Sequence, residues 1–314
     1  MNGYDKHVYS GLLIQGKLKD AVDYLSQFPE KQHLMRRYRS VFEDGRILKR
    51  SNNPVINAID AIYQDYYRMM FWQHSSREQA AERLCKALCK LLSLQITCDG
   101  PESLEAAEEA AGAAIAGEGY CFLGGTTSGY FGPYIWRTTE PVQYDIALPQ
   151  GARTLTVCMM DGFISRSWLD FLSFGKIGTG GWAGSDGQLY CVRSAYKADF
   201  EKPSFQISYL MHEAQHALDK ELYPGISPLH LEYRAKLVEL IAYPRLTKFK
   251  SFLMEASGSD EANFHAFASY QIVNGLSQRI FGSEYESDFD NWNGKLHLIR
   301  KYSRAMLGEY SYGI

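Results

Sequence analysis

The feature that most constrains this chain is a His-Glu-x-x-His pattern formed by His212, Glu213 and His216. Residues four apart lie on one face of a helix, so both imidazoles can reach a single metal ion. Glu213 then lies beside that ion, where a carboxylate can take a proton from a bound water. The surrounding apolar spacing predicts a helix that begins near Pro203, with Ser204 as its cap.

A catalytic zinc ion takes three protein ligands and keeps one position open. After the first helix the chain turns, and Ser227 followed by Pro228 predicts the start of a second helix. Glu232 lies about 6 Å into that helix, and His216 lies about 9 Å before the end of the first. If the helices pack antiparallel, these two groups fall at similar heights. Glu239 lies two turns beyond Glu232 on the same face and is a rival ligand.

This motif, followed on the second helix by Glu232 and Ala235, resembles the gluzincin group of zinc metallopeptidases. In that group the two histidines and the downstream glutamate bind one zinc ion, and the glutamate within the first motif is the general base. The resemblance therefore favours Glu232 over Glu239 as the third ligand. It covers about residues 185–245 and does not identify the substrate.

Further polar residues are expected to assist the ligands. Glu239, if it is not a ligand, or Asp219, one turn past the second histidine, could hold a ligand histidine by its free ring nitrogen. Metallopeptidases usually add a tyrosine or histidine donor that stabilises the oxyanion. The sequence offers His265, Tyr270 and His297 for that role, and nothing in the pattern selects one of them.

Near Gly117 the sequence changes from an Ala- and Glu-rich helical pattern to Gly, Thr, Tyr and alternating apolar residues, and this change predicts two domains. Residues 1–118 read as an all-α region, in which residues 11–25 resemble part of a tetratricopeptide-type helical hairpin without a second copy. Residues 119–314 follow as a zincin-like metallopeptidase domain, as the resemblance implies, with a small mixed or antiparallel sheet. The whole chain is therefore expected to be α+β. In the first region, three further helices are predicted at residues 53–67, 78–94 and 101–111.

The predicted second domain has three parts. Residues 119–197 are β-rich, residues 203–243 hold the two helices of the site, and residues 244–314 form a mostly helical C-terminal lobe. Residues 142–148 and 153–159 alternate apolar and polar side chains about a turn, which predicts a hairpin.

By the resemblance, a strand at residues 188–196 forms the sheet edge along which an extended substrate lies. The loop at residues 178–184 would then border the cleft. An ordinary edge strand with its connection is the alternative interpretation of the same residues.

Composition limits the partners that the chain can have. Hydrophobic residues make up 46% and charged residues 22% of the 314 residues, which is ordinary for a soluble globular protein. A net charge of −3 gives no field that would gather nucleic acid or anionic lipid. Because no run of about 18 apolar residues occurs, no membrane span is expected.

Compartment is indicated by the N-terminus and by the cysteines. The first residues lack the basic and apolar regions of a secretory signal. Six cysteines are scattered without a paired framework, which favours the cytoplasm. Cys85 and Cys89 share a helical face and could bind a metal, although two buried small side chains are the favoured interpretation.

Three classes of function follow from these features. The favoured one is a zinc-dependent peptidase that acts on a peptide or protein substrate, with one zinc ion per chain. The second is a zinc hydrolase of another amide or ester, and the third is a catalytically inactive binding protein of zincin-like fold. An intact Glu213 argues against the third class, because metal binding alone does not need that carboxylate.

Overall fold

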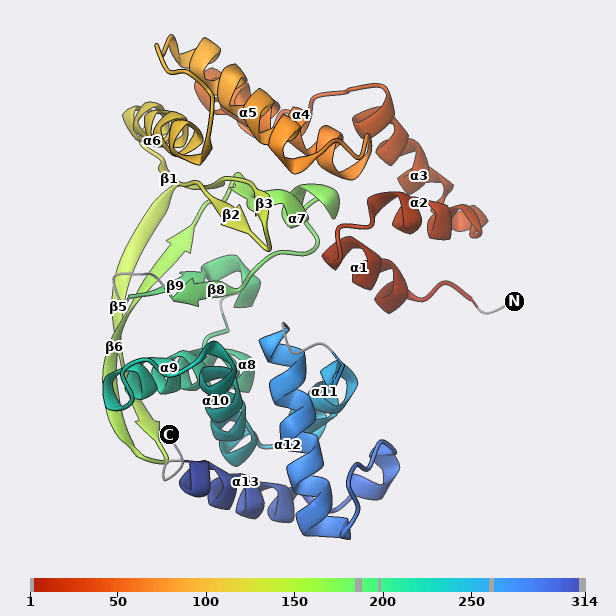
Figure 1. Cartoon of the computed structure of the whole chain (residues 1–314), viewed down its shortest axis with the longest axis vertical. Coiled ribbons are helices and arrows are strands. Elements are labelled where there is room, and N and C mark those ends of the chain that lie inside the picture. Colours follow the sequence, from red (N-terminus) through yellow and green to blue (C-terminus); the bar gives the residue numbers. More distant parts are fainter. Residues whose placement is uncertain (1–2, 184–187, 197–198, 260–262, 311–314) are drawn as a thin grey trace. The chain divides into compact units, whose positions relative to one another are not determined.

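The computed structural model describes residues 3–183, 188–196, 199–259 and 263–310 (Figure 1). Helices and small β-sheets both occur in this part of the chain, so the expected α+β class is confirmed. Among the described helices, none combines the length and the apolar character that a transmembrane segment requires.

The chain forms two compact units, each described here by itself. The first consists of Met1–Thr139 and Met160–Thr179, and the second of Glu140–Met159 and Gly180–Ile314. This division differs from the predicted boundary after residue 118, and it splits the β-rich segment 119–197. Strand pairing is the reason, because β4 (Tyr134–Trp136) pairs with β7 (Ser165–Arg166) and so returns the chain to the first unit.

The first unit is mostly helical. Its α-helices are α1 (Lys6–Ile14), α2 (Leu18–Ser26), α3 (Gln32–Tyr38), α4 (Pro54–Phe71), α5 (Arg77–Leu92), α6 (Pro101–Gly117) and α7 (Ser167–Leu172). The three helices predicted after residue 52 are confirmed as α4, α5 and α6. Asn53 and Ser76 cap the first two of these by accepting hydrogen bonds from backbone N–H groups. Gly16, with a φ of 71°, makes the turn between α1 and α2, which pack together.

Two small sheets and an aromatic core complete the first unit. One sheet has the order β1-β4-β7, with β1 at Cys121–Leu123, and the other pairs β2 (Thr126–Thr127) with β3 (Tyr130–Phe131). Aromatic side chains of α4 and α7 pack into the core, where Tyr63, Tyr67 and Trp168 are buried. This burial of ring area is a main source of stability for the unit.

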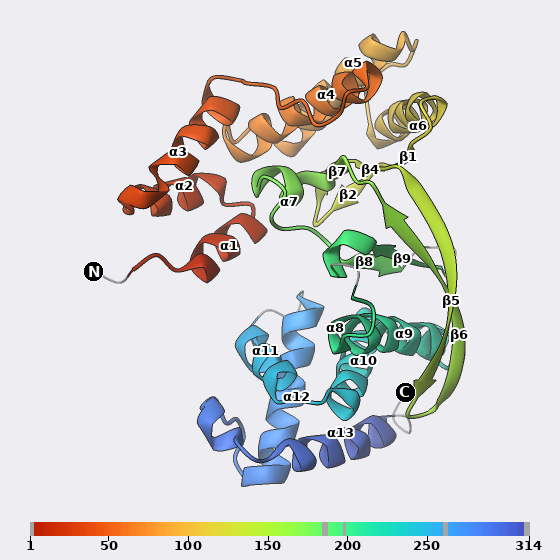
Figure 2. The ribbon, with the colours of Figure 1, turned by 180° about the vertical axis from the view of Figure 1, so that it is seen from behind.

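The second unit contains a four-stranded sheet of order β5-β6-β9-β8. The predicted hairpin is confirmed, since β5 (Thr138–Leu148) and β6 (Gly151–Asp161) run side by side (Figure 2). The strand expected over residues 188–196 is shorter, because β9 (Leu189–Val192) gives way to a 3₁₀ helix.

The expectation that this strand forms the sheet edge is wrong. A three-residue strand, β8 (Gly181–Ala183), pairs antiparallel with β9 and takes the edge position. β8 lies within the segment 178–184 that was expected to be a loop, and it is too short to show alternation in the sequence. Residue 184 of that segment, and residues 185–187 at the start of the gluzincin-like region, lie outside the described residues.

The helices of the second unit surround α10. They are α8 (Pro203–Phe205), a π-helical segment (Gln206–Met211), α9 (His212–Leu222), α10 (Pro228–Ala242), α11 (Thr247–Glu255), α12 (Phe264–Phe281) and α13 (Leu296–Tyr310). α10 packs against α9, α12 and α13, and its residues 233–241 are all buried. The mostly helical character predicted for the C-terminal lobe is therefore confirmed.

The starts of the two site helices differ in how well the sequence predicts them. Ser204 is not the cap of the first helix, because Pro203 is already helical and Lys202 takes the cap position without a side-chain hydrogen bond. Ser227 does cap α10, and its hydroxyl accepts a hydrogen bond of 3.3 Å from the His230 backbone N–H. A proline tolerates the first helical position because it needs no hydrogen bond there.

Candidate metal centre

The two histidines of the motif lie one turn apart on α9, as the helical spacing predicts. Their ring centroids are 4.5 Å apart, and both side chains are mostly buried. The π-helical segment ends at Met211, directly before His212. Such segments are frequent at functional sites because they re-aim the side chains that follow.

Glu232 on α10 faces both imidazoles. Its carboxylate oxygens lie 3.5 Å from Nε2 of His212 and 3.7 Å from Nε2 of His216. Two ligands held about 2.1 Å from one zinc ion at tetrahedral angles lie about 3.4 Å apart. Nε2 of His216 is buried and has no hydrogen-bond partner within the described ranges. The separations and this orphaned nitrogen fit a shared metal ion better than direct hydrogen bonds.

Glu239 lies on the other side of the first imidazole. Its Oε1 accepts a hydrogen bond of 2.9 Å from Nδ1 of His212, and its Oε2 lies 2.5 Å from the ammonium of Lys248 on α11. With Nδ1 occupied in this way, Nε2 of His212 points toward Glu232. The geometry therefore suits Glu239 as the support of a ligand and not as the ligand itself.

The same contacts set the protonation states of the metal-free site. Burial alone would lower the pKa of His212, but the attraction of the facing carboxylates of Glu232 and Glu239 outweighs it and raises that pKa to about 9. Burial would raise the pKa of Glu232 and of Glu239, yet the facing histidine lowers both, so these carboxyls are ionised. Two anionic carboxylates around one imidazole make a site suited to a cation.

Glu213 lies at the edge of this group. Its Oε2 is 3.6 Å from Nδ1 of His216, and ligand atoms of His212, Glu213 and His216 all lie within 4.8 Å of one another. Burial would raise the pKa of Glu213, but the neighbouring histidines lower it. The side chain is therefore an ionised carboxylate at neutral pH, as a general base must be.

The carboxylate of Asp219 pairs with Arg234, and not with a ring nitrogen of a histidine. Its Oδ1 forms an ion pair of 2.9 Å with Nε of Arg234 on α10, and both side chains are 0% exposed. Gln215 donates a further hydrogen bond of 2.8 Å to the same oxygen. Burial raises the pKa of Asp219, and Arg234 opposes that shift. The pair joins α9 to α10 and so fixes the distance between the histidines and Glu232.

Of the three expected oxyanion donors, one lies at the site. Nδ1 of His265 on α12 is 2.8 Å from Oε2 of Glu232, and its side chain is 62% exposed. Tyr270 stacks on Tyr285 at 5.4 Å between ring centroids, away from the ligands, and His297 lies exposed on α13. The structure thus brings together His265 and the ligands, but not the other two.

Sequence reasoning missed three groups near the site. Lys248 fixes Glu239, although nothing in its spacing marks it. Burial raises the pKa of Tyr196 and of Tyr209, and the charge of Glu213 raises both further, which places these phenols near that carboxylate. Tyr196 is the last residue of the strand predicted at residues 188–196, and that pattern gave no sign of the influence of Glu213 on it.

Comparison of the chain with protein families, with curated proteins and with solved structures found no match. Functional inference therefore depends on the residues themselves. The described residues contain two groups of side chains that could hold a metal ion, the one built on His212 and another formed by Cys85, Cys89 and Cys98.

Proposed function

We propose that this chain is a zinc-dependent peptidase with a zincin-like site, in which His212, His216 and Glu232 are the zinc ligands. The observation that carries the proposal is the orientation of the two imidazoles. Both direct Nε2 at the carboxylate of Glu232, while Nδ1 of the first is occupied by Glu239. Two neutral imidazoles and one carboxylate are a common ligand set of catalytic zinc.

The chemistry follows from charge. Zinc, when bound, supplies a Lewis acid that polarises a carbonyl and lowers the pKa of water. Glu213, which is ionised at neutral pH, accepts the proton of the attacking water and passes it to the leaving amine. Glu239 and Lys248 hold the orientation of His212.

An oxyanion formed during attack needs a donor. His265 approaches Glu232 from α12, and its exposed imidazole can turn toward a substrate. Tyr196 is the alternative donor, since it lies near Glu213. We propose His265 first, because its Nδ1 lies 2.8 Å from Oε2 of the proposed ligand Glu232.

The compartment proposed is the cytoplasm. All six cysteines are free thiols. Cytosolic proteins keep their thiols reduced, whereas secreted proteins of this size often use them in disulfides. A peptide or protein is the proposed substrate, and another amide or ester is the alternative.

The test combines metal analysis with a peptide-library digest. Purified protein should contain a zinc equivalent that is lost in His212→Ala and kept in Glu213→Gln and in Cys98→Ser. Cleavage of the library should disappear in Glu213→Gln. Cleavage of simple esters or amides without cleavage of peptides would support the alternative hydrolase, and zinc without any hydrolysis would support the inactive binding protein.

A further inference from the structure

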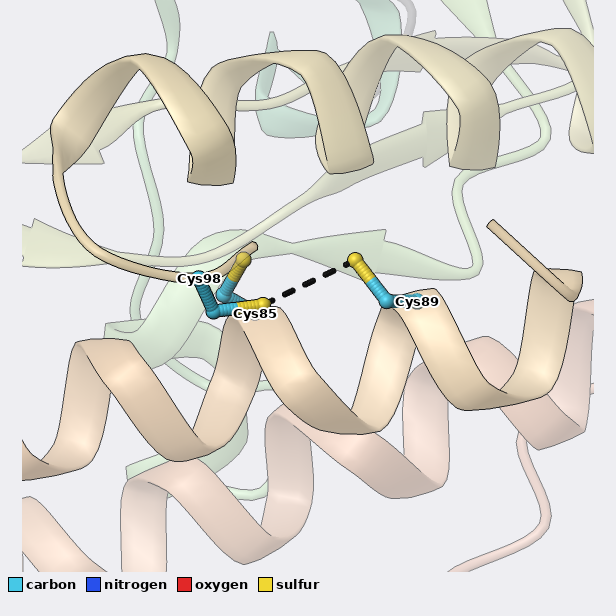
Figure 3. Close-up of side chains that lie close together, drawn as sticks. All are labelled: Cys85, Cys89 and Cys98. Carbon is cyan, nitrogen blue, oxygen red and sulfur yellow. Dashed lines mark hydrogen bonds between the residues drawn. The ribbon is translucent and has the colours of Figure 1, made fainter. Parts of the chain in front are cut away.

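The second group of possible metal ligands lies wholly in the first unit, on α5 and the loop that follows it. Cys85 and Cys89 are one helical turn apart. Ser93 ends the helix with a left-handed φ of 54°, and the Leu94 N–H then bonds the Cys89 carbonyl at 2.9 Å. The loop turns back from this point, and Cys98 comes to lie beside the two helical cysteines (Figure 3).

The end of the loop is fixed as well as its start. The hydroxyl of Ser103, in the first turn of α6, donates a hydrogen bond of 2.9 Å to Oδ1 of Asp99. The Asp99 N–H also bonds the Thr97 carbonyl at 3.1 Å. Cys98 therefore lies between the backbone hydrogen bond of Leu94 to Cys89 and the hydrogen bonds of Asp99, which position it beside α5.

The sulfur positions suit one metal ion. All three Sγ atoms lie within 4.8 Å of one another, and the Cys98 thiol donates a hydrogen bond to Sγ of Cys89, 3.7 Å away (Figure 3). Two sulfurs held about 2.3 Å from one ion at tetrahedral angles lie about 3.8 Å apart. A disulfide would require about 2.05 Å. The observed separation thus matches shared coordination.

The surroundings shield the helical part of the group from solvent, since Cys85 is 2% and Cys89 6% exposed. Cys85 and Cys98 also line a cavity of about 670 Å³ together with Arg77 and Asp99, which provides a route of entry for an ion.

We propose that Cys85, Cys89 and Cys98 bind one soft metal ion, Cu⁺ or Zn²⁺, at a site separate from the His212 centre. Thiolates select these ions over Mg²⁺, Ca²⁺ and Mn²⁺. Among the described residues the group holds no fourth His, Cys, Asp or Glu. Three sulfurs complete a trigonal Cu⁺ site, whereas Zn²⁺ takes its fourth ligand from the cavity.

The test uses the full-length His212→Ala variant, in which the other centre is disabled, with its thiols kept reduced. Titration with Co²⁺ should give a sulfur-to-cobalt charge-transfer band that saturates at one ion per chain and disappears when Zn²⁺ or Cu⁺ is added. Cys98→Ser should weaken Co²⁺ binding at least about tenfold, since one of three ligands is lost. Cys121→Ser is the matched control, because Cys121 is another partly exposed cysteine of the same unit, and it should leave binding unchanged.

X-ray absorption keeps the proposal testable if Cys98→Ser does not fold. The zinc-loaded His212→Ala protein should show a shell of about three sulfurs at about 2.3 Å. A shell of nitrogen and oxygen alone, or reduced protein without a sulfur-to-cobalt band, would overturn the assignment. Equal loss of binding in Cys121→Ser and Cys98→Ser would overturn it too, because it would indicate non-specific thiol binding.

Discussion

The two candidate metal-binding groups, one of histidines and one of cysteines, have a similar arrangement along the chain but differ in what holds their side chains in place. Each has a pair of candidate ligands four residues apart on a helix, His212 with His216 and Cys85 with Cys89. The proposed third ligand comes from a later segment in both, Glu232 in one and Cys98 in the other. Charged neighbours orient the histidine group. Backbone hydrogen bonds and burial hold the cysteine group.

This difference follows from the chemistry of the ligands. An imidazole has two nitrogens, so a partner such as Glu239 must occupy one to direct the other. A thiol has a single sulfur, whose position the backbone and rotamer already fix. Ionised carboxylates and a lysine ammonium surround the first group, whereas two of the three thiols of the second are buried.

The largest effect that separates the two groups is expected for Glu213→Gln. Removing the proposed general base should lower peptide hydrolysis by roughly 10²–10⁴-fold, because proton transfer contributes about that much. Cys98→Ser should leave hydrolysis within about twofold of the parent, since Cys98 belongs to the cysteine group of the first unit. Steady-state kinetics on one peptide, with zinc content measured in parallel, checks both. Equal losses in the two variants would break the comparison.

The next effect concerns the buried ion pair of Asp219 with Arg234, which joins α9 to α10 beside the histidine group. Asp219→Ala should reduce the free energy of unfolding by about 3–5 kcal/mol, because Arg234 is left as a buried charge without its carboxylate partner. Glu82→Ala is the control, since it removes an exposed pair with Lys86 and should cost less than about 1 kcal/mol. Urea denaturation measures both. A small loss for Asp219→Ala would remove this ion pair as the frame of the site.

How far the sequence predicts the site depends on the range of the contacts involved. Helical periodicity places His212, Glu213 and His216 on one face, because it is a local property. It leaves Glu232 and Glu239 open, since they lie two turns apart on one face of α10. Only the packing of α9 on α10 assigns one to the Nε2 atoms and the other to Nδ1.

Contacts made by returning loops and short strands had no sequence signal. Cys98 joins the cysteines of α5 through a loop, and Lys248 reaches Glu239 from a separate helix. The edge strand β8 has three residues, too few to show alternation. The expected domain boundary came from a local change in composition near residue 117. The observed boundary depends instead on the long-range pairing of β4 with β7.

A moderate effect is expected for Glu239→Gln. It should weaken zinc binding by about 10–100-fold, because the imidazole of His212 loses the anionic partner that fixes its orientation. Glu221→Gln serves as the control, since that exposed carboxylate pairs with Arg153. Competition with a chelator measures the affinities. Complete loss of zinc in Glu239→Gln, together with full retention in Glu232→Gln, would exchange the roles of the two glutamates.

A further effect is a dependence on protons. His212 has a pKa of about 9 without metal, since the attraction of two carboxylates outweighs burial, so at about pH 7 zinc must displace its proton. Affinity should therefore rise with pH by roughly tenfold per unit for one displaced proton, and this gain should end above about pH 9. Calorimetry in buffers of different ionisation enthalpy counts the protons released. Zinc binding without proton release would contradict this protonation state.

The position of zinc in a crystal of the zinc-loaded protein tests the central claim most directly. Anomalous diffraction at the zinc edge should place a peak about 2.0–2.2 Å from Nε2 of His212, Nε2 of His216 and a carboxylate oxygen of Glu232. Glu239 should remain on Nδ1 of His212. A peak bound by Glu239 in place of Glu232, or no peak between the two imidazoles, would contradict the account.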